Sequence, residues 1–107
     1  MDRIEWYYGK RNIYASEWPV ENPKGVVQIV HGMIEHIGRY ETFIKELNQE
    51  GYVVVGEDHM GHGRTARDRK NFGVFTGGWM DLVEDVADLQ RQTAAKYPGL
   101  TYIMLGH

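Results

Sequence analysis

The chain has no cysteine, only three prolines and no apolar run long enough to cross a bilayer. The missing thiols exclude disulfides, thiolate metal sites and a cysteine nucleophile. A membrane-spanning helix needs about 20 apolar residues in succession, so we expect none here. The N-terminus also lacks a basic segment followed by an apolar run, so no signal peptide is expected. We therefore expect a soluble, cytoplasmic protein.

Acidic and basic residues are nearly balanced. The chain carries 12 Lys and Arg residues against 15 Asp and Glu residues, a net charge of -3. Such a balance gives no overall basic field for nucleic acid or an anionic membrane, and nucleic acid is not an expected partner. A length of 107 residues with 42% hydrophobic content suits one globular domain.

The most informative stretch is an apolar run followed at once by a polar one. Residues 25–30 (Gly-Val-Val-Gln-Ile-Val) are mostly β-branched, which is typical of a strand buried on both faces in a parallel sheet. Residues 31–40 then bring two histidines, two glycines, a glutamate and an arginine. Ligands of open α/β sheets bind at the carboxyl ends of the strands, so this segment is a candidate site.

Residue spacing elsewhere predicts alternating strands and helices. The expected elements are, in order, a hairpin over 3–18, a helix over 40–50, a strand over 52–56, a helix over 79–96 and a strand over 100–105. A long loop over 57–78 separates the last helix from the strand before it, and loops of that length are usually functional or mobile. The expected core face of the last helix is Trp79, Leu82, Val83, Val86 and Leu89, with Asp85 structural. This order predicts an α/β fold: an antiparallel hairpin plus parallel strands sandwiched by helices.

The chain ends directly after its last predicted strand. A parallel strand needs helices over both faces, and nothing follows here to supply them. We therefore expect residues 1–107 to be the N-terminal part of a single domain: a truncated or split chain, or one interrupted at a modified residue.

Several motifs resemble those of the monoacylglycerol lipase and lysophospholipase group of α/β-hydrolases. They are residues 31–36 (His-Gly-Met-Ile-Glu-His) with Arg39-Tyr40, residues 58–63 (Asp-His-Met-Gly-His-Gly), Asp85-Val86, Tyr97-Pro98 and the final Gly106-His107. In that family the strand that ends in the last of these motifs runs into Gly-His-Ser-x-Gly. The nucleophilic serine would therefore follow His107 directly, and the catalytic acid and histidine would come later in the chain. The resemblance implies an ester hydrolase without a cofactor whose triad lies beyond this chain.

The resemblance also assigns roles to the first polar loop. It implies that the backbone N–H of Met33 is one donor of the oxyanion hole, and Gly32 lets the loop bring that donor close to the substrate. Glu35 and Arg39 are close enough in sequence to pair and fix this loop. His31 and His36 are expected to hydrogen-bond its backbone.

The second polar loop is expected to be structural. Its residues Asp58, His59, Gly61, His62 and Gly63 are expected to hold hydrogen bonds at the strand end. Asp58 resembles a catalytic acid by position, but the family places that acid on a later strand. Gly106 and His107 are expected to form the start of the nucleophile elbow, with His107 packing rather than acting as the base.

Other kinds of site match the residue chemistry less well, and no metal site is expected. A zinc site could draw on His31, His36, His59 and His62, with Glu35, Glu57 and Asp58 completing it. Gly61-His-Gly63, with Ala66 at the third position, is a faint match to a dinucleotide fingerprint. The basic residues Arg64, Arg67, Arg69 and Lys70 suit a solvated loop or a contact with an anionic membrane surface.

Three functions are therefore compared. The first is hydrolysis of a small lipid or ester, with peripheral membrane contact as an accessory feature. The second is a serine aminopeptidase-like activity on the same scaffold, because fold alone does not select the substrate. The third is a non-catalytic chain that binds a complementary chain, such as the remaining C-terminal part of the same protein.

Overall fold

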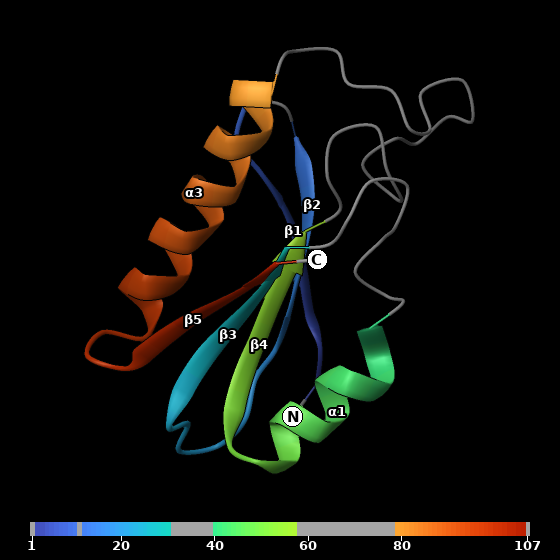
Figure 1. Ribbon diagram of the computed structural model, residues 1–107, viewed down its shortest axis with the longest axis vertical. Coiled ribbons are helices and arrows are strands. Elements are labelled where there is room, and N and C mark those ends of the chain that lie inside the picture. Colours follow the sequence, from blue (N-terminus) through green and yellow to red (C-terminus); the bar gives the residue numbers. More distant parts are fainter. Residues whose placement is uncertain (1, 11, 31–39, 58–78, 107) are drawn as a thin grey trace.

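The structure is a computed structural model that describes residues 2–10, 12–30, 40–57 and 79–106. Its elements are β1 (Ile4–Tyr8), β2 (Ile13–Trp18), β3 (Gly25–Val30), α1 (Glu41–Gln49), β4 (Tyr52–Glu57), α3 (Trp79–Lys96) and β5 (Thr101–Gly106). The strands form one five-stranded sheet in the order β1-β2-β4-β3-β5. Figure 1 shows α1 and α3 on opposite faces of this sheet. The expected α/β architecture is thus confirmed.

Strand direction divides the sheet into two parts. β1 and β2 form the antiparallel hairpin, and β2 continues antiparallel along β4. β3 then pairs in parallel with β4 on one side and β5 on the other. The three parallel strands predicted from the sequence therefore lie side by side, with β3 in the middle.

The apolar residues of β3 and β4 are buried on both faces because successive side chains of a strand point to opposite sides. Val27, Ile29 and Val54 pack with Ile44 of α1. Val26, Val53 and Val55 form a cluster on the other face, which Tyr97, Leu100 and Tyr102 help to cover. The near-continuous apolar composition of these strands follows from this double burial.

α1 is joined to β4 by a tight connection. Gly51 has φ of +94°, a left-handed conformation that favours glycine just past a helix end. Its N–H donates to the carbonyl of Asn48 at 3.0 Å. The Asn48 amide in turn donates to the carbonyls of Trp18 at 3.1 Å and Tyr52 at 2.8 Å. The end of α1 is thus tied to two strands of the sheet.

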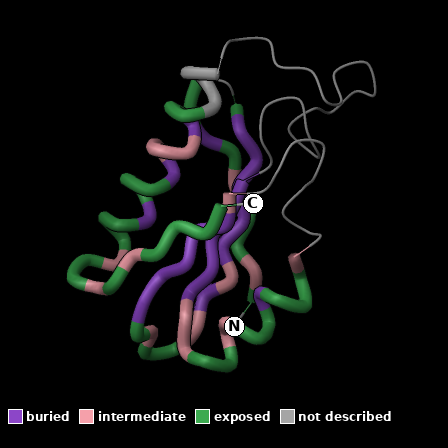
Figure 2. The backbone as a smooth tube through the Cα atoms, viewed as in Figure 1, coloured by how far each residue is buried: buried purple, intermediate pink, exposed green. Residues whose placement is uncertain are grey.

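One expectation about burial needs correction. Val83 was expected in the core but is 42% exposed, because the side of α3 that faces the sheet runs through Asp85, Leu89 and Thr93 at four-residue spacing. β5 has the composition of a buried strand, yet Ile103, Met104 and Leu105 are exposed (Figure 2). β5 is the last strand in the sheet order, and among the described strands it pairs with β3 alone.

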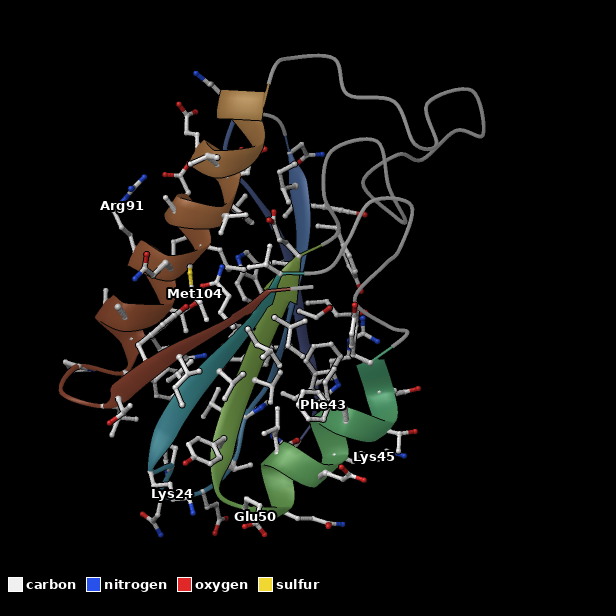
Figure 3. The ribbon with its side chains drawn as sticks, viewed as in Figure 1. Lys24, Phe43, Lys45, Glu50, Arg91 and Met104 are labelled. Atoms are coloured by element: carbon white, nitrogen blue, oxygen red, sulfur yellow. The ribbon has the colours of Figure 1, made fainter. Side chains whose placement is uncertain are left out.

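Packing under α1 yields a stability prediction. Ile44 is fully buried, whereas its neighbour Phe43 on the same helix, labelled in Figure 3, is 38% exposed. Replacing Ile44 with Ala should lower the free energy of unfolding by about 2–5 kcal/mol, because the cavity cannot close completely. Urea denaturation measures this loss, and Phe43→Ala is the matched control, with a smaller loss because its ring is partly exposed. Equal losses for both variants would contradict the packing described here.

Candidate functional site

The carboxyl ends of β3, β4 and β5 form one edge of the sheet. Pairing places Ile29 opposite Gly56 of β4, and Val30 opposite Gly106 of β5. The segments that begin at residues 31, 58 and 107 therefore leave from three adjacent strand ends. This is the edge at which open α/β sheets bind their ligands.

Most of the predicted site residues lie outside the described part of the chain. These are His31, Gly32, Met33, Glu35, His36, Arg39, Asp58, His59, Gly61, His62, Gly63 and His107. The basic residues Arg64, Arg67, Arg69 and Lys70 also fall there. Gly106 is described, as the last residue of β5. A Cβ at Gly106 would meet no atom within 4 Å, so its described surroundings do not themselves require glycine.

Just below this edge, a layer of buried polar side chains connects the sheet to α3. Glu57, the last residue of β4, is fully buried on the α3 side. The Tyr8 hydroxyl lies 3.0 Å from Glu57 Oε2 and 2.6 Å from the backbone carbonyl of Asp85. One hydroxyl thus joins the hairpin, the end of β4 and the middle of α3.

Gln28 makes the corresponding connection from β3. Its amide donates to the backbone carbonyl of Val86 on α3 at 3.2 Å. Its side-chain oxygen accepts a hydrogen bond from the Tyr102 hydroxyl of β5. Adjacent carbonyls of α3, those of Asp85 and Val86, are therefore held by side chains from two different strands.

The environment keeps the tyrosines of this layer protonated. Burial, with the Glu57 charge and hydrogen bond next, raises the pKa of Tyr8 well above its ordinary value. Burial raises the pKa of Tyr102 to about 12, with a hydrogen bond from Thr93 acting in the opposite direction. Away from this layer, burial and a hydrogen bond to Glu17 also raise the pKa of Tyr97. The hydroxyls of Tyr8 and Tyr102 thus remain donors at neutral pH.

Sequence reasoning missed this layer, although part of its signal is visible. Gln28 is the one polar residue inside an otherwise apolar strand, which marks it for a buried hydrogen bond. Glu57 was placed in the loop after β4, but it belongs to the strand and shares a face with Val53 and Val55. Tyr8 reaches Glu57 across 49 residues of sequence, a contact that spacing cannot indicate.

A single serine, Ser16 on β2, occurs in the chain. It is fully buried, and the guanidinium of Arg3 donates to its Oγ at 2.8 and 3.2 Å. Arg3 also stacks over the Trp18 ring at 4.8 Å from the ring centre. Buried beneath this guanidinium, Ser16 is in a structural position rather than in a site open to substrate.

Carboxylates that could hold a metal gather on α3 within the described residues. Oxygen atoms of Glu84, Asp85 and Asp88 lie within 4.8 Å of one another. Basic side chains already accompany two of them, since Lys10 lies 3.5 Å from Glu84 and Arg91 pairs with Asp88. The charges of Glu84 and Asp88 are therefore balanced by basic side chains without a metal ion.

A shallow groove of about 280 Å³ lies between the hairpin and the C-terminal half of α3. Its walls include Trp6, whose indole N–H donates to Gln92 at 3.3 Å. Its charged lining is an ion pair in which Lys96 donates to the buried carboxylate of Glu17 at 2.9 Å. None of these residues belongs to the strand-end edge. Within the described residues, no helix is both long and apolar enough to cross a membrane.

The chain matches a known protein family. A family model described as serine aminopeptidase, S33, matches residues 21–107, which include β3, β4, β5, α1 and α3. The chain belongs to this family. As an S33-family chain, it is part of the group of α/β-hydrolases that includes the monoacylglycerol lipases.

Individual relatives agree with this assignment. The monoacylglycerol lipase of Mycolicibacterium smegmatis is 36% identical over 99 residues, covering 92% of this chain and 34% of that protein. A carboxyl esterase from Bacillus coagulans, solved with glycerol, superposes with a TM-score of 0.89 at 39% identity, covering the whole chain and 36% of that structure. The S33 chain thus spans about a third of these proteins. Protein K6 of vaccinia virus, 34% identical over 71 residues, is matched over 88% of its own length.

The Tyr8 contact leads to a mutational prediction. Tyr8→Phe keeps the ring but removes the hydroxyl from the Glu57 carboxylate and the Asp85 carbonyl, so it should lower the free energy of unfolding by about 1–3 kcal/mol. Chemical denaturation followed by circular dichroism measures the loss. Tyr7→Phe is the control, because the exposed side chain of Tyr7 can exchange a lost hydrogen bond for water. An unchanged free energy of unfolding in Tyr8→Phe would show that the hydroxyl does not stabilise the packing of α3.

The raised tyrosine pKa values also predict how stability depends on pH. Well below the ordinary pKa of 10.0 both states keep the tyrosine protons, so these tyrosines add no pH dependence to stability. Above it the unfolded chain loses protons that the folded chain retains, so stability should fall as pH rises toward about 12, the pKa of Tyr102 in the folded chain. Denaturation across this interval measures the slope, which Tyr102→Phe should reduce. A slope unaffected by Tyr102→Phe would contradict the assignment.

Proposed function

We propose that the complete protein hydrolyses carboxylic esters through a serine acyl-enzyme, with a monoacylglycerol or lysophospholipid as substrate. Membership of the S33 family and the likeness to a monoacylglycerol lipase and a carboxyl esterase support this proposal. The observation that carries it is the pairing of Val30 with Gly106. Val30 precedes the His31 segment and Gly106 precedes the proposed nucleophile elbow, so the two segments start from adjacent strand ends.

The reaction builds negative charge on the carbonyl oxygen of the ester. Two backbone N–H groups at fixed positions would stabilise this charge, each contributing roughly 3–4 kcal/mol. In the proposed site one donor is Met33, the third residue after β3. The other is the residue after the nucleophile, which follows β5. Because β3 and β5 are neighbours, both donors start from adjacent strand ends.

The nucleophile is proposed to be a serine directly after His107. Ser16 is a poor candidate for that role, because it is buried and held by Arg3. An activated serine needs a histidine base and an orienting carboxylate, and in this family both come later in the chain. The proposed triad therefore lies outside the 107 residues. This part of the protein would contribute the first oxyanion donor and the start of the elbow.

The remaining predicted residues are proposed to support these groups. Glu35 and Arg39 would fix the conformation of the first loop, with His31 and His36 hydrogen-bonded to its backbone. The loop with Asp58, His59, Gly61, His62 and Gly63 would brace it from the end of β4, next to β3 in the sheet. The chemistry requires no cofactor, because serine, histidine and carboxylate are sufficient for acyl transfer.

A second candidate is a serine aminopeptidase-like activity, which the description of the matching family favours. It shares the nucleophile and the oxyanion hole, so only the substrate separates the two activities. Comparing turnover of nitrophenyl butyrate with that of an aminoacyl amide by the complete protein distinguishes them. Faster ester turnover supports the first proposal, and faster amide turnover supports the second.

A third candidate is a non-catalytic chain that binds a complementary one. The length of protein K6 is compatible with it, because this chain matches 88% of that protein. Expressed alone, the 107-residue chain should then bind a partner and leave nitrophenyl butyrate intact. Ester hydrolysis by the chain alone would contradict both this candidate and the placement of the triad outside it.

The oxyanion proposal predicts a large effect at one position of the complete protein and a small effect at its neighbour. Gly32→Val should displace the Met33 N–H and lower kcat by about 100- to 1,000-fold, the effect of losing one donor. Met33→Leu keeps the backbone N–H and should leave kcat within a few-fold of the parent. Steady-state ester hydrolysis measures both variants. A large kcat loss in Met33→Leu with none in Gly32→Val would show that the backbone of this loop is not the donor.

A further inference from the structure

A side-chain hydrogen bond joins β3 to β5 in addition to their backbone pairing. The Tyr102 hydroxyl of β5 donates to the side-chain oxygen of Gln28 on β3. Pairing sets Tyr102 opposite Val26, which precedes Gln28 by two residues, so the bond runs diagonally across the two strands. Figure 1 shows these strands side by side. Diagonal neighbours on one face are within reach of an aromatic side chain.

The diagonal direction makes this bond a restraint on sliding. A bond straight across two strands barely changes length when one strand slides along the other, whereas a diagonal bond lengthens or shortens at once. An O–H···O bond keeps its strength only between about 2.5 and 3.0 Å. The bond between Tyr102 and Gln28 therefore opposes movement of β5 along β3, in addition to the slanted backbone bonds of a parallel pair.

The other end of the Gln28 amide is fixed on α3. Its nitrogen donates to the backbone carbonyl of Val86 at 3.2 Å. Gln28 is fully buried, so losing either hydrogen bond would leave a polar group without compensation from water. Because the oxygen and the nitrogen bond to different elements, one side chain connects β3, β5 and α3 at a single point.

This point lies just below the carboxyl edge of the sheet. Gln28 is opposite Met104 of β5, and two residues further along Val30 is opposite Gly106. Two strand residues span about 6–7 Å. Movement of β5 along β3 would therefore change the spacing between the segments that begin at residues 31 and 107.

We infer that Gln28 is a positioning residue for ester hydrolysis: through Tyr102 it sets how far β5, and with it the nucleophile elbow, stands along β3. This inference rests on the proposed function. Oxyanion donors must lie about 2.7–3.1 Å from the oxygen that becomes charged, and a displacement of about 1 Å can cost about 100-fold in rate. Gln28 contacts no substrate in this arrangement and acts through the positions of the two strand ends.

Three variants of the complete protein separate this role from general packing. Gln28→Met keeps the length of the side chain but removes both hydrogen bonds. Tyr102→Phe removes the bond from the β5 side and leaves the bond between Gln28 and Val86 in place, so it carries the test even where Gln28→Met does not fold. Tyr97→Phe is the matched control, because the Tyr97 hydroxyl donates to Glu17 on β2 and does not join β3 to β5. Circular dichroism checks that each variant folds.

The readout is the ratio of kcat/KM for an ester to that for its thionoester analogue. The analogue carries sulfur in place of the carbonyl oxygen, and sulfur is a larger and weaker acceptor, so the oxyanion donors assist it less. Gln28→Met and Tyr102→Phe should lower kcat/KM for the ester by about 10- to 100-fold and lower the ratio as well. A purely structural role would reduce both substrates equally and leave the ratio unchanged, as expected for Tyr97→Phe.

A double variant tests whether the two side chains act through one bond. Gln28→Met already removes the bond to Tyr102, so adding Tyr102→Phe should lower the ratio no further. Further, additive loss in the double variant would show that the two side chains act separately, which would overturn the inference.

The remaining outcomes distinguish this inference from the proposed function. An active parent whose ratio is unchanged in Gln28→Met and Tyr102→Phe would overturn the inference and leave the esterase proposal intact. An equal fall of the ratio in Tyr97→Phe would also overturn it, because the effect would then not depend on the bond between β3 and β5. A folded parent that hydrolyses neither substrate would overturn the proposed function, and the inference with it.

Discussion

The rest of this structure depends on β3 being paired in parallel on both sides. Its central place forces one set of alternate side chains toward α1 and the other toward α3, so it needs apolar residues on both faces. The same pairing brings three strands to a common carboxyl edge. If β3 were instead an edge strand, the polar segment after Val30 would have a neighbouring strand end on one side only. Fold and candidate site thus follow from one set of backbone hydrogen bonds.

The α3 face adds a second constraint, because its contacts with the sheet are polar as well as apolar. Leu89 packs against Tyr8, Ile13 and Ala15, which secures the helix but does not define its position along the strands. The Tyr8 and Gln28 side chains bond to individual carbonyls of α3 and therefore do define it. Buried polar groups are costly when a partner is lost, so such contacts specify one arrangement. They lie next to the strand ends, where a shift of the helix would matter most.

Local patterns in the sequence were sufficient for the elements and their order. The hairpin, α1 with Ile44 inward, and the three parallel strands all follow from alternation, helical spacing and glycine stops. What local patterns missed depends on neighbours far away in the sequence. Val83 looked like a core residue by spacing, but the buried stripe of α3 runs through Asp85 and Thr93. Glu57 looked like a loop residue until Tyr8 supplied its partner from the hairpin. The family resemblance identified the group correctly, while the roles of Met33 and the loop histidines stay predictions.

The central claim is that this chain brings an oxyanion loop to a nucleophile that lies just past its last strand. Reaction of the complete protein with a fluorophosphonate, followed by peptide mass spectrometry, tests it most directly, because only an activated serine reacts readily. The account predicts one adduct, on a serine directly after His107, and none on the 107-residue chain, whose Ser16 is buried against Arg3. An adduct on Ser16, or a complete protein that takes up no label, would contradict it.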